Sequence, residues 1–201
     1  MAEGLQALLG VLAVVQPAFT QPGFRHLVVL FAGWVRTTGI HAVTETLVVT
    51  GVAGNRHHEA YHRFFSRGTW MPDRIGRLLF NVIEQLLPAD GPIPIVIDDS
   101  LAPKKGPHVF GLGSHLDPVR STKKQKIFTF GHCWVVLAIR MRVPFSNRTW
   151  ALPVLFRLYR QKKECENKGD TCRKKTELAR EMIAEAAIEV LHFSINEGET
   201  A

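Results

Sequence analysis

Cysteine is scarce in this sequence, and apolar runs long enough to cross a membrane are missing. The 201 residues include three cysteines, Cys133, Cys165 and Cys172, an odd and low number that argues against a disulfide framework and suits a reducing compartment. The apolar stretches at residues 5–15 and 27–35 are shorter than a membrane-spanning helix. The first follows "MAEG", which has an acid and no base, whereas a signal peptide begins with positive charge. We therefore expect a cytoplasmic protein that does not enter a membrane.

Acidic residues are also fewer than basic ones. Asp and Glu number 18 against 25 Lys and Arg, which gives a net charge of +7 with neutral His. Such an excess favours polyanionic partners, either nucleic acid or an acidic membrane surface. Hydrophobic residues make up 46% of the chain, enough for a packed core, so wholesale disorder is excluded.

A change of pattern near residue 88 divides the chain. Before it, apolar residues such as Phe24, Leu27 and Phe31 recur at helical spacing. Prolines and a glycine at 88–94 stop a helix, and the following runs predict strands at 93–97, 126–141 and 149–160, the last two antiparallel, and then a helix from Thr176. The sequence predicts an α+β fold, with a helical domain at 1–88 that could bind DNA and a β-β-β-α unit at 89–201.

Residues 50–70 have the outline of a helix-turn-helix. Gly51 and Gly54 separate two short helical segments, and the second of these is rich in Arg and His. This arrangement is the outline of a DNA-binding motif, and an ordinary helical hairpin, which is commoner, has the same outline.

Two adjacent carboxylates, Asp98 and Asp99, follow the apolar run at 93–97. The run is apolar on both faces, which indicates a central strand ending at the acids. Because side chains alternate across a strand, only one of the two acids can point into a given cleft. A carboxylate at the end of such a strand can hold Mg²⁺, which prefers oxygen ligands, although aspartates that form turns or cap helices explain the pair as well.

The segment after the acids is strongly basic. Its cations can neutralise the phosphates of DNA, and the alternative is a solvated loop. They are Lys104, Lys105, Arg120, Lys123, Lys124 and Lys126.

Three stretches, "IVIDDSLAPKKGPHVFG", "STKKQKIFTFGHCWVVLAI" and "NRHHEAYHRFFSRGTW", resemble the DDE transposases of bacterial insertion sequences from about residue 24 to 191. The resemblance implies a ribonuclease H-like catalytic domain that cuts and joins DNA with Mg²⁺ or Mn²⁺ and three carboxylates. It implies that Asp99 is the first catalytic acid and metal ligand, with Asp98 beside it as a second candidate ligand.

The sequence departs from that family in its later acids. The family's second aspartate follows on a strand after the helix that here runs to about residue 191, and no such strand is predicted. Asp117 and Asp170 fall in loops, and Glu197 and Glu199 in a polar tail. We therefore expect an amino-terminal, truncated part of a transposase whose ribonuclease H-like unit is incomplete. Such a part would bind metal weakly or not at all, lack cleavage activity and self-associate through an exposed sheet edge. The alternative is a non-catalytic fragment that binds DNA or inhibits a full-length enzyme.

One further motif belongs to another class of enzyme. His58, Glu59 and His62 match H-E-x-x-H, which on a helix can bind Zn²⁺ for hydrolysis with the glutamate as general base. The match is short, histidines are common here and the surroundings are basic, so this interpretation is the less favoured alternative.

Overall fold

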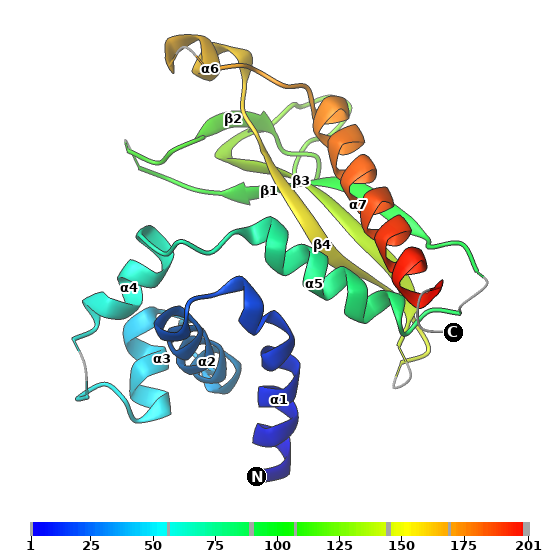
Figure 1. The fold of residues 1–201 in the computed structure, drawn as a ribbon. Helices are drawn as coiled ribbons and strands as arrows, with labels where there is room; N and C mark the ends of the chain where they lie inside the picture. The colour runs from blue at the N-terminus through cyan, green and yellow to red at the C-terminus, as the bar shows by residue number, and fades with distance from the viewer. Residues whose placement is uncertain are drawn as a thin grey trace. The chain divides into compact units, whose positions relative to one another are not determined.

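The computed structural model describes residues 2–55, 57–88, 91–106, 108–143, 146–168 and 170–198, which form two compact units, Met1–Leu78 and Leu79–Ala201. The first unit is helical, as predicted. The division falls inside the last of five α-helices, because the second half of that helix contributes to the core of the second unit. The helices, shown from blue to green in Figure 1, are α1 (Ala2–Val15), α2 (Gln21–Arg36), α3 (Val43–Thr50), α4 (Glu59–Ser66) and α5 (Pro72–Glu84).

The helical unit is built around α2. Leu30 of α2 is buried with Leu47 of α3 and with Tyr61 and Phe64 of α4. Gly51 ends α3 with φ 76°, a left-handed conformation that favours glycine, so the predicted glycine turn is confirmed. The connection from α3 to α4 runs from residue 51 to 58, however, and the turn of a helix-turn-helix has only about three or four residues. The geometry is therefore that of a helical pair with a long loop.

The second unit contains a four-stranded antiparallel sheet in which every strand pairs with β3 (Phe128–Arg142). β1 (Ile95–Pro103) lies along one edge of β3. β2 (Gly113–Leu116) and β4 (Thr149–Tyr159) pair with successive parts of the opposite edge. They cannot lie on the edge that β1 occupies, because each pairs with residues of β3 that also pair with β1. Two helices follow, α6 (Lys162–Lys168) and α7 (Lys175–Gly198). Together with the helical unit, this makes the fold α+β, as expected.

One face of the sheet is covered by helices. Alternate residues of β3, from Val135 to Met141, are buried, as the period of a half-covered strand requires. Leu178 and Met182 of α7 pack on this face, and both are at most 2% exposed. Figure 1 shows α7 running along the sheet. Phe80 and Ile83 of α5 complete the same core.

The prediction of a central strand ending at the two acids is wrong in both respects. Among the described residues β1 pairs with β3 alone, so it is an edge strand. Asp98 and Asp99 lie in its middle, opposite Val136 and Val135. The strand continues beyond the acids because β3 offers pairing partners as far as Gly131. The apolar run at 93–97 does not predict this extension, because it depends on a distant segment of the chain.

Smaller elements also differ from the expectation. β2 and α6 lie in segments expected to be loops. α7 begins at Lys175, one residue before the predicted start at Thr176. The carboxylate of Glu177 accepts the backbone N–H of Lys174 at 2.8 Å, next to this helix start. Pro153 lies beside a shift in the register between β3 and β4, the kind of irregularity at which a strand tolerates proline.

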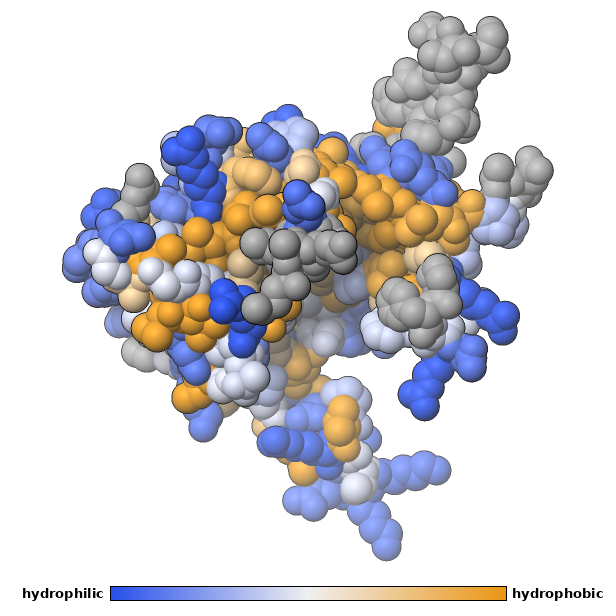
Figure 2. All heavy atoms as spheres, turned by 90° about the horizontal axis from the view of Figure 1, so that it is seen from below, coloured by the Kyte–Doolittle hydropathy of each residue, from blue (hydrophilic) through white to orange (hydrophobic). Residues whose placement is uncertain are grey.

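The exposed surface includes several apolar areas, visible in orange in Figure 2. None of the helices in the described part of the chain combines the length and the apolar character that a membrane crossing requires.

Candidate active site and nucleic-acid interface

Asp99 lies on the face of the sheet that α7 covers, and α7 supplies its main partner. The ammonium of Lys175, the first residue of α7, donates a hydrogen bond to Oδ2 of Asp99 at 2.5 Å. The thiol of Cys133 donates to the same oxygen at 3.4 Å. The hydrogen bond from Lys175 lowers the pKa of Asp99 and outweighs the opposing effect of burial. Asp99 therefore stays ionised at more acidic pH than a free aspartate does.

Lys175 is stabilised as a cation by the same contacts. Partial burial lowers its pKa, but the hydrogen bonds to Asp99 and Cys133 outweigh burial, so the pKa stands above its ordinary value. The ring of Tyr159 on β4 lies 5.2 Å from the ammonium and adds a cation–π contact. Lys175 is thus the built-in counter-ion of Asp99.

A buried histidine completes this side of the sheet. His115 of β2 is 7% exposed, its ring centroid lies 5.9 Å from that of Tyr159, and its Nε2 has no hydrogen-bond partner among the described residues. Burial lowers the pKa of His115, and the charge of Lys175 lowers it further. Sequence reasoning missed both Lys175 and His115, because they approach Asp99 and Tyr159 only through the pairing of distant segments.

Asp98 points the other way. It belongs to the opposite face of β1, and its Oδ1 accepts the backbone N–H of Asp99 at 2.8 Å. The N–H of Lys104 and the carbonyl of Pro94 bond to β3, so the backbone groups of the even-numbered residues face β3. The N–H of Asp99, an odd-numbered residue, therefore faces away from β3. The structure therefore does not bring the two carboxylates together; Asp98 satisfies a donor on the open edge of the sheet.

The described residues do not form a complete metal site. They contain no group of three or more His, Cys, Asp or Glu residues close enough to hold an ion. Asp99 offers one half-exposed carboxylate, and that carboxylate already binds an ammonium. A site for Mg²⁺ or Mn²⁺ with several oxygen ligands is therefore not assembled by this part of the chain.

Hydrogen bonds to Asp117 fix the conformation of the basic loop that follows β2. Asp117 is buried and its Oδ1 accepts the backbone N–H groups of Val119 and Arg120, both at 3.0 Å, while its Oδ2 accepts the hydroxyl of Thr129 at 3.2 Å. These hydrogen bonds, the one from Arg120 first, lower the pKa of Asp117. Asp117 thus organises the loop that carries Arg120, Lys123, Lys124 and Lys126, and those four side chains are exposed.

Three of the predicted DNA-binding residues line one groove. Lys104 and Lys105, which follow β1, and Arg120 of the loop surround a volume of about 800 Å³ together with Phe128 and Phe130 of β3. The N–H of Lys104 donates to the carbonyl of Phe130 at 3.1 Å, which fixes the basic end of β1 beside the start of β3. Lys123, Lys124 and Lys126 do not line this groove.

The helical unit gives the zinc interpretation little support. The rings of His58 and His62 have centroids 5.8 Å apart, but Glu59, the required base, forms an ion pair with Arg63 at 2.6 Å. This hydrogen bond lowers the pKa of Glu59, which makes the carboxylate a weaker proton acceptor than a free glutamate. No third ligand joins the two histidines within the described residues.

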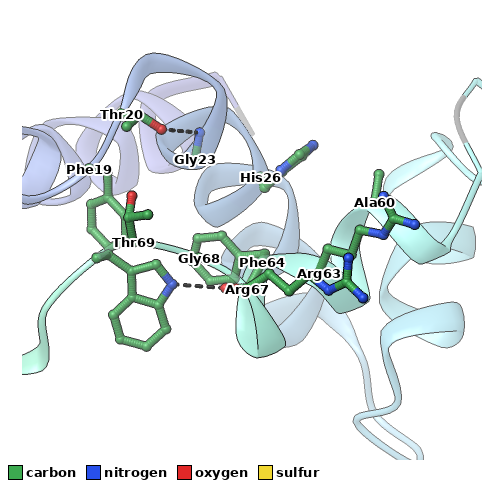
Figure 3. Close-up of a pocket in the computed structure, with 11 residues that line it drawn as sticks. Phe19, Thr20, Gly23, His26, Ala60, Arg63, Phe64, Arg67, Gly68 and Thr69 are labelled. Carbon is green, nitrogen blue, oxygen red and sulfur yellow. Dashed lines mark hydrogen bonds between the residues drawn. The ribbon is translucent and has the colours of Figure 1, made fainter.

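Arg63 and Arg67 instead border an aromatic pocket of about 280 Å³, drawn in Figure 3. Phe19 and Phe64 line it, and the indole N–H of Trp70 donates to the carbonyl of Phe64 at 2.9 Å. The stacked rings give this end of the helical unit its packing.

Comparison with known proteins identifies the family of the chain. No curated protein and no solved structure matches the chain. A family model described as DDE superfamily endonuclease matches residues 15–195. Because that match covers most of both units, the chain belongs to the DDE superfamily endonucleases, whose catalytic domain has a ribonuclease H-like fold.

Proposed function

We propose that this chain supplies the first catalytic acid and part of the DNA-binding surface of a transposase-type nuclease. The observation that carries the proposal is the position of Asp99 on the first strand of the sheet, held as a carboxylate by Lys175. The family membership supports phosphodiester chemistry on DNA, and the superfamily generally uses a divalent metal. We propose Mg²⁺ or Mn²⁺ as that metal.

We further propose that residues 1–201 do not cleave DNA by themselves. Phosphoryl transfer depends on several positioned charges around the reacting phosphate. Within the described residues Asp99 belongs to no group of three or more potential metal ligands, and its ion-pair partner is a cation. The chain's own contribution is to keep Asp99 ionised and oriented until further acidic ligands are present.

DNA is the proposed substrate, bound mainly through phosphates. The six cations named above lie on the end of β1 and on the loop that Asp117 organises, which favours a sequence-independent, salt-sensitive interaction. If all six contact phosphates, the logarithm of the affinity falls with the logarithm of salt concentration with a slope of about −5.

Cleavage and binding assays with the purified chain test these proposals. End-labelled duplexes of random and terminal-repeat sequence are incubated with Mg²⁺ or Mn²⁺, with Asp99→Ala as the test variant and Asp98→Ala as the control. We expect salt-dependent binding and no cleavage. Metal-dependent cleavage that is lost in Asp99→Ala and kept in Asp98→Ala would establish an active enzyme and contradict the proposed inactivity.

We also propose self-association through the outer edge of β1. The N–H and carbonyl groups of its odd-numbered residues face away from β3, and Ile95 and Val96 are 38% and 39% exposed. An open, partly apolar edge strand can pair with a second copy. Light scattering should detect oligomers of the wild-type chain. Val96→Lys should reduce them, and the control Trp150→Lys, on β4, should leave them in place. A monomeric wild-type chain would refute this proposal.

A further inference from the structure

Two phenylalanine rings are exposed in the basic groove. Phe128 and Phe130 are each 63% exposed and, being two residues apart on β3, lie on the same face of the strand. The backbone hydrogen bond between Lys104 and Phe130 holds the strand that bears the lysines against the one that bears the rings. Cations and aromatic faces thus line the same 800 Å³ groove.

The combination of cations and exposed aromatic rings in one groove favours one kind of ligand. An apolar protein surface laid on the rings would also bury the charges of Lys104, Lys105 and Arg120, which is costly without anions to pair them. A nucleic-acid strand satisfies both parts, because its phosphates pair with the cations and its bases stack on the rings.

The spacing of the rings excludes stacked bases of a duplex as that ligand. Two residues of a strand span about 6.7 Å, roughly twice the separation of about 3.4 Å between successive nucleotides in a duplex strand. Bases that contact both rings must therefore be separated from each other, and a paired duplex does not present its base faces at all.

We propose that this groove binds single-stranded DNA, with its phosphates on Lys104, Lys105 and Arg120 and an unstacked base on each of Phe128 and Phe130. The inference rests on the proposed function in so far as the ligand is DNA, and it goes further by assigning a single-stranded segment to this site. Phe128 and Phe130 are then binding residues that the charge pattern alone does not identify.

The test compares a labelled single strand of about a dozen nucleotides with the duplex of the same sequence, using the whole chain. The test variant combines Phe128→Leu and Phe130→Leu, which keeps apolar bulk and removes the rings. A second variant combines Lys104→Gln and Lys105→Gln. Phe156→Leu is the matched control, because Phe156 is also exposed, at 43%, but lies on β4 outside the groove.

We expect the double Phe variant to lose single-strand affinity by about 5- to 150-fold for each ring that stacks, with unchanged duplex affinity and salt slope. The double Lys variant should lower the affinity for both the single strand and the duplex, and it should flatten the salt dependence of binding. Phe156→Leu should change neither.

Each other outcome has a defined meaning. A wild-type chain that binds neither DNA refutes the proposed function and this inference together. Normal DNA binding with no effect of the Phe variant, or an equal loss for both ligands, overturns the inference alone. Loss of self-association in place of single-strand affinity assigns the rings to a protein contact and overturns it too. Should the variants not fold, a single strand containing 2-aminopurine reports on the wild-type chain, and an unchanged fluorescence on binding would overturn the inference.

Discussion

The pair of Asp99 and Lys175 makes a quantitative prediction about stability. The two charged atoms are 2.5 Å apart, but the side chains are 47% and 41% exposed, so water and salt screen much of their attraction. At that distance the Coulomb energy in water is about 1.7 kcal/mol, and ordering the two side chains offsets part of it. We therefore expect a coupling free energy of roughly 0.5–1 kcal/mol at neutral pH.

A double-mutant cycle measures this coupling. Asp99→Asn, Lys175→Met and the double variant are unfolded with urea and followed by circular dichroism, with Lys174→Met replacing Lys175→Met in a control cycle. Lys174 is the exposed neighbour of Lys175, so the control cycle should be additive.

The pH dependence gives a second check. The pKa of Asp99 is lowered from 3.8, so its contribution is full above pH 3.8 and is lost as the pH falls through the lowered value. The pKa of Lys175 is raised from 10.5, so the contribution is full below pH 10.5 and is lost as the pH rises through the raised value. A coupling near zero at pH 7, or one that does not decline once Asp99 is protonated, would refute the ion pair.

Four other perturbations follow from the structure. Leu137→Ala removes a fully buried side chain of β3 and should lower the free energy of unfolding by about 2–5 kcal/mol in urea titrations; a loss below about 1 kcal/mol would mean that the site is not core. Gly131→Ala would place a Cβ 2.4 Å from the carbonyl oxygen of Ala102, so β1 should be displaced, and hydrogen exchange should accelerate in β1 more than in β4. Asp117→Ala removes the acceptor of two loop N–H groups, so exchange should accelerate at Val119 and Arg120, and unchanged rates would contradict its organising role. Changing Lys123, Lys124 and Lys126 to Gln should flatten the salt slope of DNA binding by up to about 2.7; an unchanged slope would exclude them from the interface.

The sequence predicted the elements whose signals are local. The alternating burial of β3 and the helix that carries Leu178 and Met182 follow from side-chain periodicity. The edge position of β1 could not be derived in the same way, because it depends on which distant segments pair with it. The four residues of β2 are too short for a periodic pattern and form a strand only through pairing with β3.

The candidate site shows the same division. The sequence context and the family resemblance select Asp99 as the candidate acid, which stays a prediction. The groove brings together three of the six clustered cations, Lys104, Lys105 and Arg120. Lys175 lies 76 positions from Asp99 along the chain, and no local pattern marks the start of a helix as the partner of a distant acid. For Phe128 and Phe130 the sequence predicts only a position in a strand. It does not predict their exposure, because an apolar residue in a strand can be buried or exposed.

The dependence of the whole sheet on β3 has a consequence for how the chain is made. β1 is synthesised before β3, the strand with which it pairs in the described part of the chain, and β3 extends to Arg142. While that partner is being synthesised, Ile95 and Ile97 have no strand to pair with. The nascent chain is therefore most exposed to aggregation between the synthesis of Pro103 and that of Arg142, which is the interval in which a chaperone would protect it most.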